Sequence, residues 1–148
     1  MAKMGSRGRW AVAAAAALVA ATVGIVAAQG RPGRGKWVAA WATSQQALGT
    51  APIANATVRM IARVAIPGDQ VRVRLDNTYG TTPLPIGRAT VALRRGGASL
   101  VPGTLKRLTF GGAEQATIPA GGSVVSDAVP LAVRARQDLA VSFHVPSR

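Results

Sequence analysis

Residues 57–77 read TVRMIARVAIPGDQVRVRLDN, and this stretch decides the fold class. Apolar and polar side chains alternate with a period of two on both sides of Pro67–Gln70, which is the pattern of strands that have one dry face. Proline, glycine and aspartate in the interruption are typical turn residues. The stretch therefore predicts a β-hairpin whose apolar residues face each other in three pairs: Ile66 with Val71, Val64 with Val73, and Ala62 with Leu75.

The polar side of this hairpin is basic. The same register places Arg63 opposite Arg74, which is unfavourable unless the charges are solvated or bridged, and Asp76 lies nearby. One interpretation is a solvated face with a weak network of ion pairs. The other is a binding surface for an anionic ligand or for an acidic neighbouring domain, with Arg63 and Arg74 as the candidate residues.

Short alternating segments follow at regular intervals, and no helical period of 3.6 appears after residue 28. This spacing is typical of an antiparallel sandwich or barrel, and we favour an all-β, jelly-roll-like β-sandwich over residues 37–148. We expect loops at 45–56 and 78–85. Strands are expected at Ile86–Arg94, Ser99–Val101, Leu105–Phe110, Thr117–Ile118, Val124–Val125, Val129–Val133 and Asp138–Val145.

The segment Trp37–Ser44, WVAAWATS, is predicted to be the first strand or an edge strand. Trp37 and Trp41 are four residues apart and so share one face of a strand. They are expected to pack in the core, and the alternative is that both stack on a sugar.

The N-terminus has the pattern of a secretory signal. Basic residues at 3, 7 and 9 precede the uncharged apolar run Trp10–Ala28, and small residues end the run. We predict a helical signal peptide at 1–28, cleaved between Ala28 and Gln29, and a flexible spacer at 29–36. The protein would then be secreted after a transient membrane contact. Retention of residues 10–28 as a membrane anchor is the alternative.

The composition excludes several classes of function. The formal net charge is +13, from 18 Lys and Arg against 5 Asp and Glu, but the basic residues are scattered singly, so nucleic-acid binding is not expected. The chain has no cysteine and one histidine, which predicts no disulfide, no metal site and no cofactor. That histidine, His144, alternates with core-facing neighbours and should point away from the core. No Gly-x-Ser-x-Gly motif is present, and no catalytic residue is predicted.

An ordered series of motifs resembles the N-terminal β-domain of secreted actinobacterial SGNH hydrolases, the GDSL-type lipases and esterases. The resemblance covers nearly all of residues 37–146. Its motifs are WVAAWATS at 37–44, TVR at 57–59, GDQVRVRLDN at 68–77, YGT at 79–81, PL at 83–84, LTFGG at 108–112, IPAG at 118–121, VSD at 125–127 and DLAVS at 138–142.

In that family the β-domain precedes an α/β catalytic domain that carries a Gly-Asp-Ser nucleophile motif and a late Asp-x-x-His. Neither motif has a counterpart here: Gln70 follows Gly68-Asp69, and Val141 stands three residues before His144. The resemblance therefore implies the truncated N-terminal portion of a secreted esterase, with the family's hydrolase domain as partner and with ester hydrolysis only when that domain is present.

The alternative is a stand-alone extracellular module that binds carbohydrate or another partner. Trp37, Trp41 and Tyr79 are its candidate stacking residues. The two readings differ in an observable way, because a sugar platform requires exposed aromatic rings. A membrane-anchored structural domain is a third possibility, and it depends on whether residues 10–28 are retained.

Overall fold

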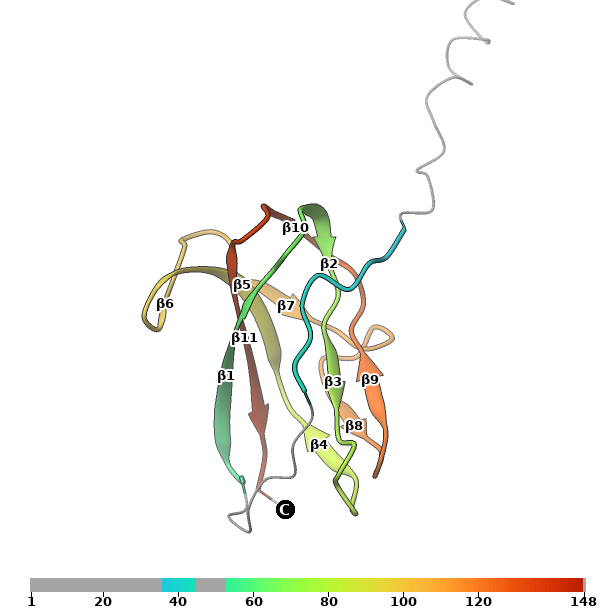
Figure 1. Cartoon of the computed structure of the whole chain (residues 1–148). Helices are drawn as coiled ribbons and strands as arrows, with labels where there is room; N and C mark the ends of the chain where they lie inside the picture. The colour runs from blue at the N-terminus through green and yellow to red at the C-terminus, as the bar shows by residue number, and fades with distance from the viewer. Residues whose placement is uncertain (1–35, 45–52, 148) are drawn as a thin grey trace, which may run out of the picture. The chain divides into compact units, whose positions relative to one another are not determined.

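The computed structural model describes residues 36–44 and 53–147 (Figure 1). The chain divides into two compact units, Met1–Val38 and Ala39–Arg148. The predicted signal helix, its cleavage point, the possible anchor and all of the spacer except Lys36 lie outside the described residues. Within the described ranges the structure is all-β, and no helix there is long and apolar enough to cross a membrane.

The second unit contains strands of three to eight residues and one strand, β6 (Ser99–Leu100), of two residues. They are β1 (Ala56–Arg63), β2 (Gly68–Val71), β3 (Arg74–Asp76), β4 (Leu84–Ile86), β5 (Ala89–Gly96), β6 (Ser99–Leu100), β7 (Lys106–Leu108), β8 (Ala116–Ile118), β9 (Ser123–Val125), β10 (Val129–Val133) and β11 (Asp138–Val145).

All pairings between these strands are antiparallel. The main sheet has the order β1-β11-β5-β6, and β7 also pairs with β5. Three two-stranded ribbons, β10-β2, β3-β9 and β4-β8, complete the unit. Figure 1 shows β1, β11 and β5 on one side and the strands β2, β3 and β9 on the other, so the inner face of the main sheet is turned toward the ribbons.

The predicted hairpin is wrong, although its strands exist. β1 pairs with β11 along its whole length, whereas β2 pairs with β10 and β3 with β9. The chain leaves the main sheet after Val64, whose N–H donates to the carbonyl of Gln137 at 3.0 Å. Ile66, expected on the dry face, is 37% exposed. Alternation specifies which face of a strand is buried but not which strand it pairs with, so the turn at Pro67 connects two sheets.

Two hydrophobic clusters hold the main sheet against the ribbons. Val73, Phe110 and Phe143 contact both clusters, so the core is continuous. The inward face predicted for the last strand is confirmed, because Leu139 and Val145 are buried. The first cluster contains Val64, Ala89, Val91, Leu108, Val129, Leu131, Val133, Leu139 and Val141, and the second contains Leu75, Ile86, Ile118 and Val145.

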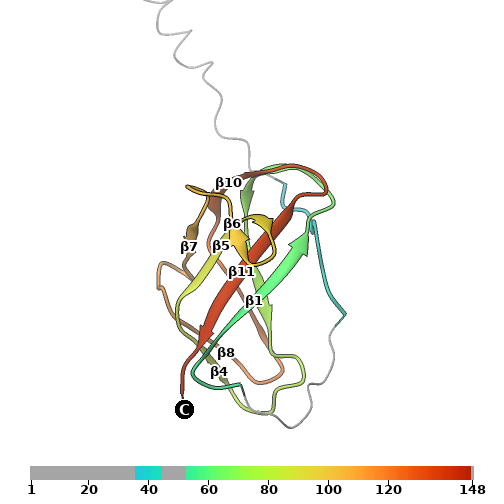
Figure 2. The ribbon, with the colours of Figure 1, turned by 90° about the vertical axis from the view of Figure 1, so that its left-hand side faces the viewer.

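The outer face of the main sheet is partly covered by the β5–β6 hairpin. Ala92 and Ala140 point to this outer face but are only 0% and 2% exposed. Figure 2, in which this face is turned toward the viewer, shows β6 lying over β5 and β11. The Nη1 of Arg59 donates to the carbonyl of Ala98 in this hairpin at 2.7 Å, which ties β1 to the cover.

The other predicted strands from residue 86 onward are confirmed, with Val129–Val133 and Asp138–Val145 matching to the residue. Ile86–Arg94 is divided, because Ile86 ends β4 and β5 begins only at Ala89. Two further predictions fail. The expected loop at 78–85 contains the start of β4, which pairs with β8. The expected strand Trp37–Ser44 is not a strand; Ala65 donates a 2.8 Å hydrogen bond to Ala40, and no sheet ladder forms there.

Candidate functional site

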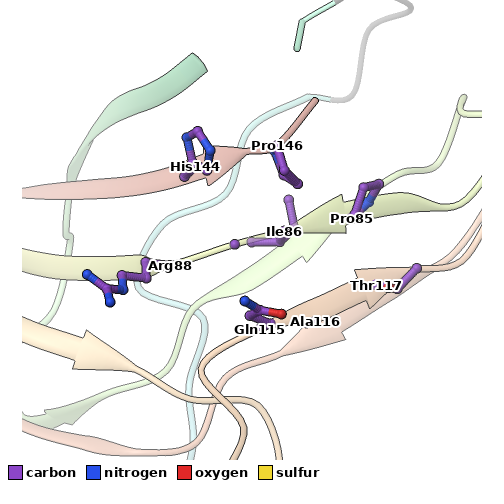
Figure 3. A pocket seen from close by; sticks show the side chains of 9 residues that line it. Pro85, Ile86, Arg88, Gln115, Ala116, Thr117, His144 and Pro146 are labelled. Atoms are coloured by element: carbon purple, nitrogen blue, oxygen red, sulfur yellow. The ribbon is translucent and has the colours of Figure 1, made fainter. Parts of the chain in front are cut away.

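A cleft of about 610 Å³ opens where β4 and β8 meet the end of β11 (Figure 3). Buried Ile86 supplies apolar surface, and the polar groups come from several elements. Concave sites that combine apolar walls with a few polar groups are the usual form of small-ligand sites. The lining residues are Pro85, Ile86, Gly87, Arg88, Gln115, Ala116, Thr117, His144 and Pro146.

His144 is held in this cleft by its backbone. Its N–H donates to the carbonyl of Arg88 at 2.9 Å, and its carbonyl accepts from Gly87 at 2.8 Å. A Cβ at position 87 would lie 3.2 Å from Cδ2 of the imidazole, so glycine leaves room for the ring. The half-buried ring is on the outer side of β11, opposite Thr57, as the alternation predicts.

The imidazole nitrogens of His144 are available to a bound polar group. The imidazole makes no side-chain hydrogen bond and no ion pair with any residue of the described part of the chain. A general base needs both a nucleophile within hydrogen-bond reach and an acid that orients its ring. Residues 36–44 and 53–147 place neither of these groups beside the ring, so they assemble no catalytic triad around His144, and the cleft is suited to holding a polar group.

Arg88, which lines the cleft, shares a carboxylate partner with Arg107. Nε of Arg88 lies 3.8 Å from one carboxylate oxygen of Glu114, and Nη1 of Arg107 lies 3.1 Å from the other. One carboxylate thus faces two guanidinium groups. Because the arginine side chains are 77% and 69% exposed, the pairs are solvent-screened and contribute little to stability.

The candidate stacking residues are exposed. Trp37 is 46%, Trp41 is 42% and Tyr79 is 59% exposed, so the expected core packing of the two tryptophans is wrong. In their segment it is Ala40 that packs against the first hydrophobic cluster. The period-two alternation of a strand does not predict which of these side chains is buried, because the segment is not part of a sheet ladder. The small side chain of Ala40 is sufficient to reach the core.

The two candidate arginines lie apart and each has a carboxylate partner. Arg63 donates to Oδ1 of Asp138 at 2.7 Å, and Arg94 donates to Oδ2 of the same residue at 2.8 Å. Arg74 is 3.2 Å from Asp76. The hydrogen bonds from Arg63 and then Arg94 lower the pKa of Asp138. These arginines are therefore used within the domain.

Sequence reasoning missed the role of Asp127. Its carboxylate accepts hydrogen bonds from the Thr109 hydroxyl at 2.6 Å and from the N–H groups of Gly112 at 2.8 Å and Gly111 at 3.2 Å. The bond from Thr109 is the main cause of the lowered pKa of Asp127. Both glycines have positive φ, 61° and 86°, which lets successive N–H groups converge on one carboxylate. In the sequence, the pair Gly111-Gly112 was the feature that could have indicated this role of Asp127.

Two further polar side chains join distant segments. The buried Ser126 hydroxyl accepts from the Val73 N–H at 2.9 Å and donates to the carbonyl of Asp127 at 3.0 Å. The Asn77 amide donates to the carbonyls of Thr82 at 2.9 Å and Pro119 at 3.1 Å. These bonds fasten the turns that connect the ribbons.

Within the described ranges, no group of three or more His, Cys, Asp or Glu side chains is placed to hold a metal ion. A scan against protein-family models and a search of curated proteins return no match to this chain.

Proposed function

We propose that this chain is the N-terminal β-sandwich portion of a secreted SGNH/GDSL-type esterase or lipase. In this proposal the strands form a jelly-roll-like sandwich, the chain is exported by the segment 1–28, and the domain packs against a hydrolase domain and shapes access to it. Ester hydrolysis requires that second domain. Membrane anchoring through residues 10–28 is the alternative for its location.

One observation carries the proposal: hydrogen bonds connect the motifs on which the resemblance rests. Asp127 of the VSD motif binds Thr109, Gly111 and Gly112 of the LTFGG motif. Asn77, at the end of GDQVRVRLDN, binds Pro119 of IPAG. The polar atoms of these motifs are thus used to join strands and turns, which is the role expected of motifs that define a β-domain rather than an active site.

A hydrolysis assay tests the absence of activity in the isolated chain. Purified protein should not hydrolyse p-nitrophenyl acetate above the buffer rate, because His144 has neither an orienting carboxylate nor a nucleophile among the described residues. Turnover by the pure protein that disappears in His144→Ala would refute the proposal. Thr117→Ala, in the same cleft, controls for a general disturbance of this region.

The encoding DNA tests the relation to an esterase. The sequence downstream of the codon for Arg148 should continue in frame and encode a Gly-Asp-Ser motif and a late Asp-x-x-His. A stop codon directly after Arg148, with no such frame downstream, would count against the proposal and leave a self-standing β-domain.

A second candidate function is carbohydrate binding, which the exposure of Trp41 and Tyr79 favours. Exposed aromatic rings can stack on sugar faces. The protein should then be retained on a column of insoluble polysaccharide, and Trp41→Ala should abolish the retention. Val125→Ala, at an exposed apolar residue of β9, is the matched control. Equal retention of wild type and Trp41→Ala would exclude this tryptophan as the platform.

A further inference from the structure

β1 forms an edge of the main sheet among the described residues. It pairs with β11 in an unbroken register from Ala56 opposite Val145 to Arg63 opposite Asp138. No strand of the described part of the chain pairs with its other edge. β1 contains no proline and no bulge, which are two of the devices that prevent an edge from accepting another strand.

The register identifies the backbone groups at this free edge. Val64 and Gln137 are the next residues along the ladder after Arg63 and Asp138, and the N–H of Val64 donates to the carbonyl of Gln137. Hydrogen-bonded and non-hydrogen-bonded pairs alternate along an antiparallel ladder, so the even-numbered residues of β1 form the hydrogen-bonded pairs with β11. The N–H and C=O groups of the odd-numbered residues therefore point outward. These residues are Thr57, Arg59, Ile61 and Arg63.

The two charges of β1 do not protect the edge. Arg59 reaches across β11, where Nε donates to the Ser142 hydroxyl at 2.8 Å, and continues to Ala98. Arg63 is drawn to Asp138 on β11. Both side chains thus extend over the sheet and away from the edge. Between them Met60 and Ile61 are 39% and 38% exposed, which leaves apolar surface beside the outward-pointing backbone groups.

We propose that β1 pairs with β1 of a second copy of this chain, antiparallel and centred on Met60, so that the two main sheets join across a two-fold axis. This register places Arg59 opposite Ile61 and Thr57 opposite Arg63 of the other copy. Moving one strand by two residues relative to the other pairs Arg59 with Arg59 in one direction and Arg59 with Arg63 in the other. Like charges directly opposite each other are destabilising. The register centred on Met60 therefore keeps Arg59, whose partners Ser142 and Ala98 carry no charge, opposite an apolar residue of the other copy. The same pairs occur twice about the two-fold axis, as in any isologous interface.

A pair of charge variants tests this register. Ile61→Arg places a cation opposite Arg59 of the second copy, twice per dimer, and should raise the dimer dissociation constant by about tenfold in sedimentation equilibrium. Ile61→Glu removes the same apolar side chain but places a carboxylate opposite Arg59, and should lower the constant by a few fold. Ala135→Arg, at an exposed turn residue, is the control for added charge and should have little effect.

Thermal melts of each variant, compared with wild type, separate lost pairing from lost folding. A wild-type protein that stays monomeric at all concentrations would overturn the proposal, as would equal effects of Ile61→Arg and Ala135→Arg. Hydrogen exchange adds a second measurement. The amides of Arg59 and Ile61 should become protected as the protein concentration rises, and full protection in the monomer would show that the edge is already covered and would also overturn the proposal.

Discussion

An engineered disulfide between β1 and β11 tests the strand order directly. Ile61 lies opposite Ala140 in the register, and because Ile61 directs its backbone groups outward, the two form a non-hydrogen-bonded pair with Cα atoms about 4.5 Å apart. This separation is at the short end of the range that disulfides span. The chain has no cysteine of its own, so Ile61→Cys with Ala140→Cys can form only one intramolecular bond.

The stabilisation should be large because the closed loop is long. The loop from residue 61 to residue 140 contains roughly 80 residues, and loop-closure entropy for that length corresponds to about 4.5 kcal/mol at 25 °C in the chain-entropy model. Strain reduces this value in practice. For a domain of this size we expect the oxidised variant to melt at least about 10 °C above the reduced one.

The assay compares thermal melts and free-thiol titration with and without reductant. The matched control is Ile61→Cys with Asp76→Cys, which would be opposite each other in a local hairpin but belong to different sheets in the structure. Rapid closure of the control, with free thiols persisting in the variant at 61 and 140, would refute the pairing of β1 with β11.

The core and the polar contacts support three further predictions. Leu108→Ala, at a fully buried side chain, should lower the free energy of unfolding by about 3 kcal/mol, whereas Leu105→Ala, 55% exposed, should cost less than about 1 kcal/mol in the same urea titration. Ser126→Ala leaves the Val73 N–H without its partner and should cost about 1–3 kcal/mol; an unchanged urea midpoint would contradict the buried hydrogen bond. The lowered pKa of Asp127 means that its contribution is present above the ordinary carboxyl pKa of 3.8 and is lost as the pH falls through the lower folded value. Unfolding measured from pH 6 to pH 2 should therefore show a smaller loss of stability in Asp127→Asn, and identical profiles would exclude this carboxylate.

Part of the candidate site could be predicted from the sequence. The alternation around His144 placed its ring on the outer side of the last strand. The cleft itself could not be predicted, because Pro85, Thr117 and His144 come from three elements distant in the chain. The role of Asp127 was missed for the same reason, since its three donors precede it by 15 to 18 residues.

The sequence by itself determined the all-β class and the position of most strands. Period-two alternation is a local property, and it identifies the buried face of Val129–Val133 or Asp138–Val145 without knowledge of any partner. Glycine at 97 marks a turn for an equally local reason, because its φ of 51° suits a residue without a Cβ.

Only the tertiary structure decided which strands pair. Every strand offers the same alternation, so the residues around Pro67 suit a local hairpin as well as a crossing between sheets. The pairing of Arg63 with Asp138 spans 75 residues. Closing so long a loop costs roughly 2 to 3 kcal/mol more than closing a hairpin turn of about four residues, because loop entropy grows with the logarithm of length. Burial of the shared core then favours the distant partner, and the same packing leaves Trp41 exposed while Ala40 takes the inner position.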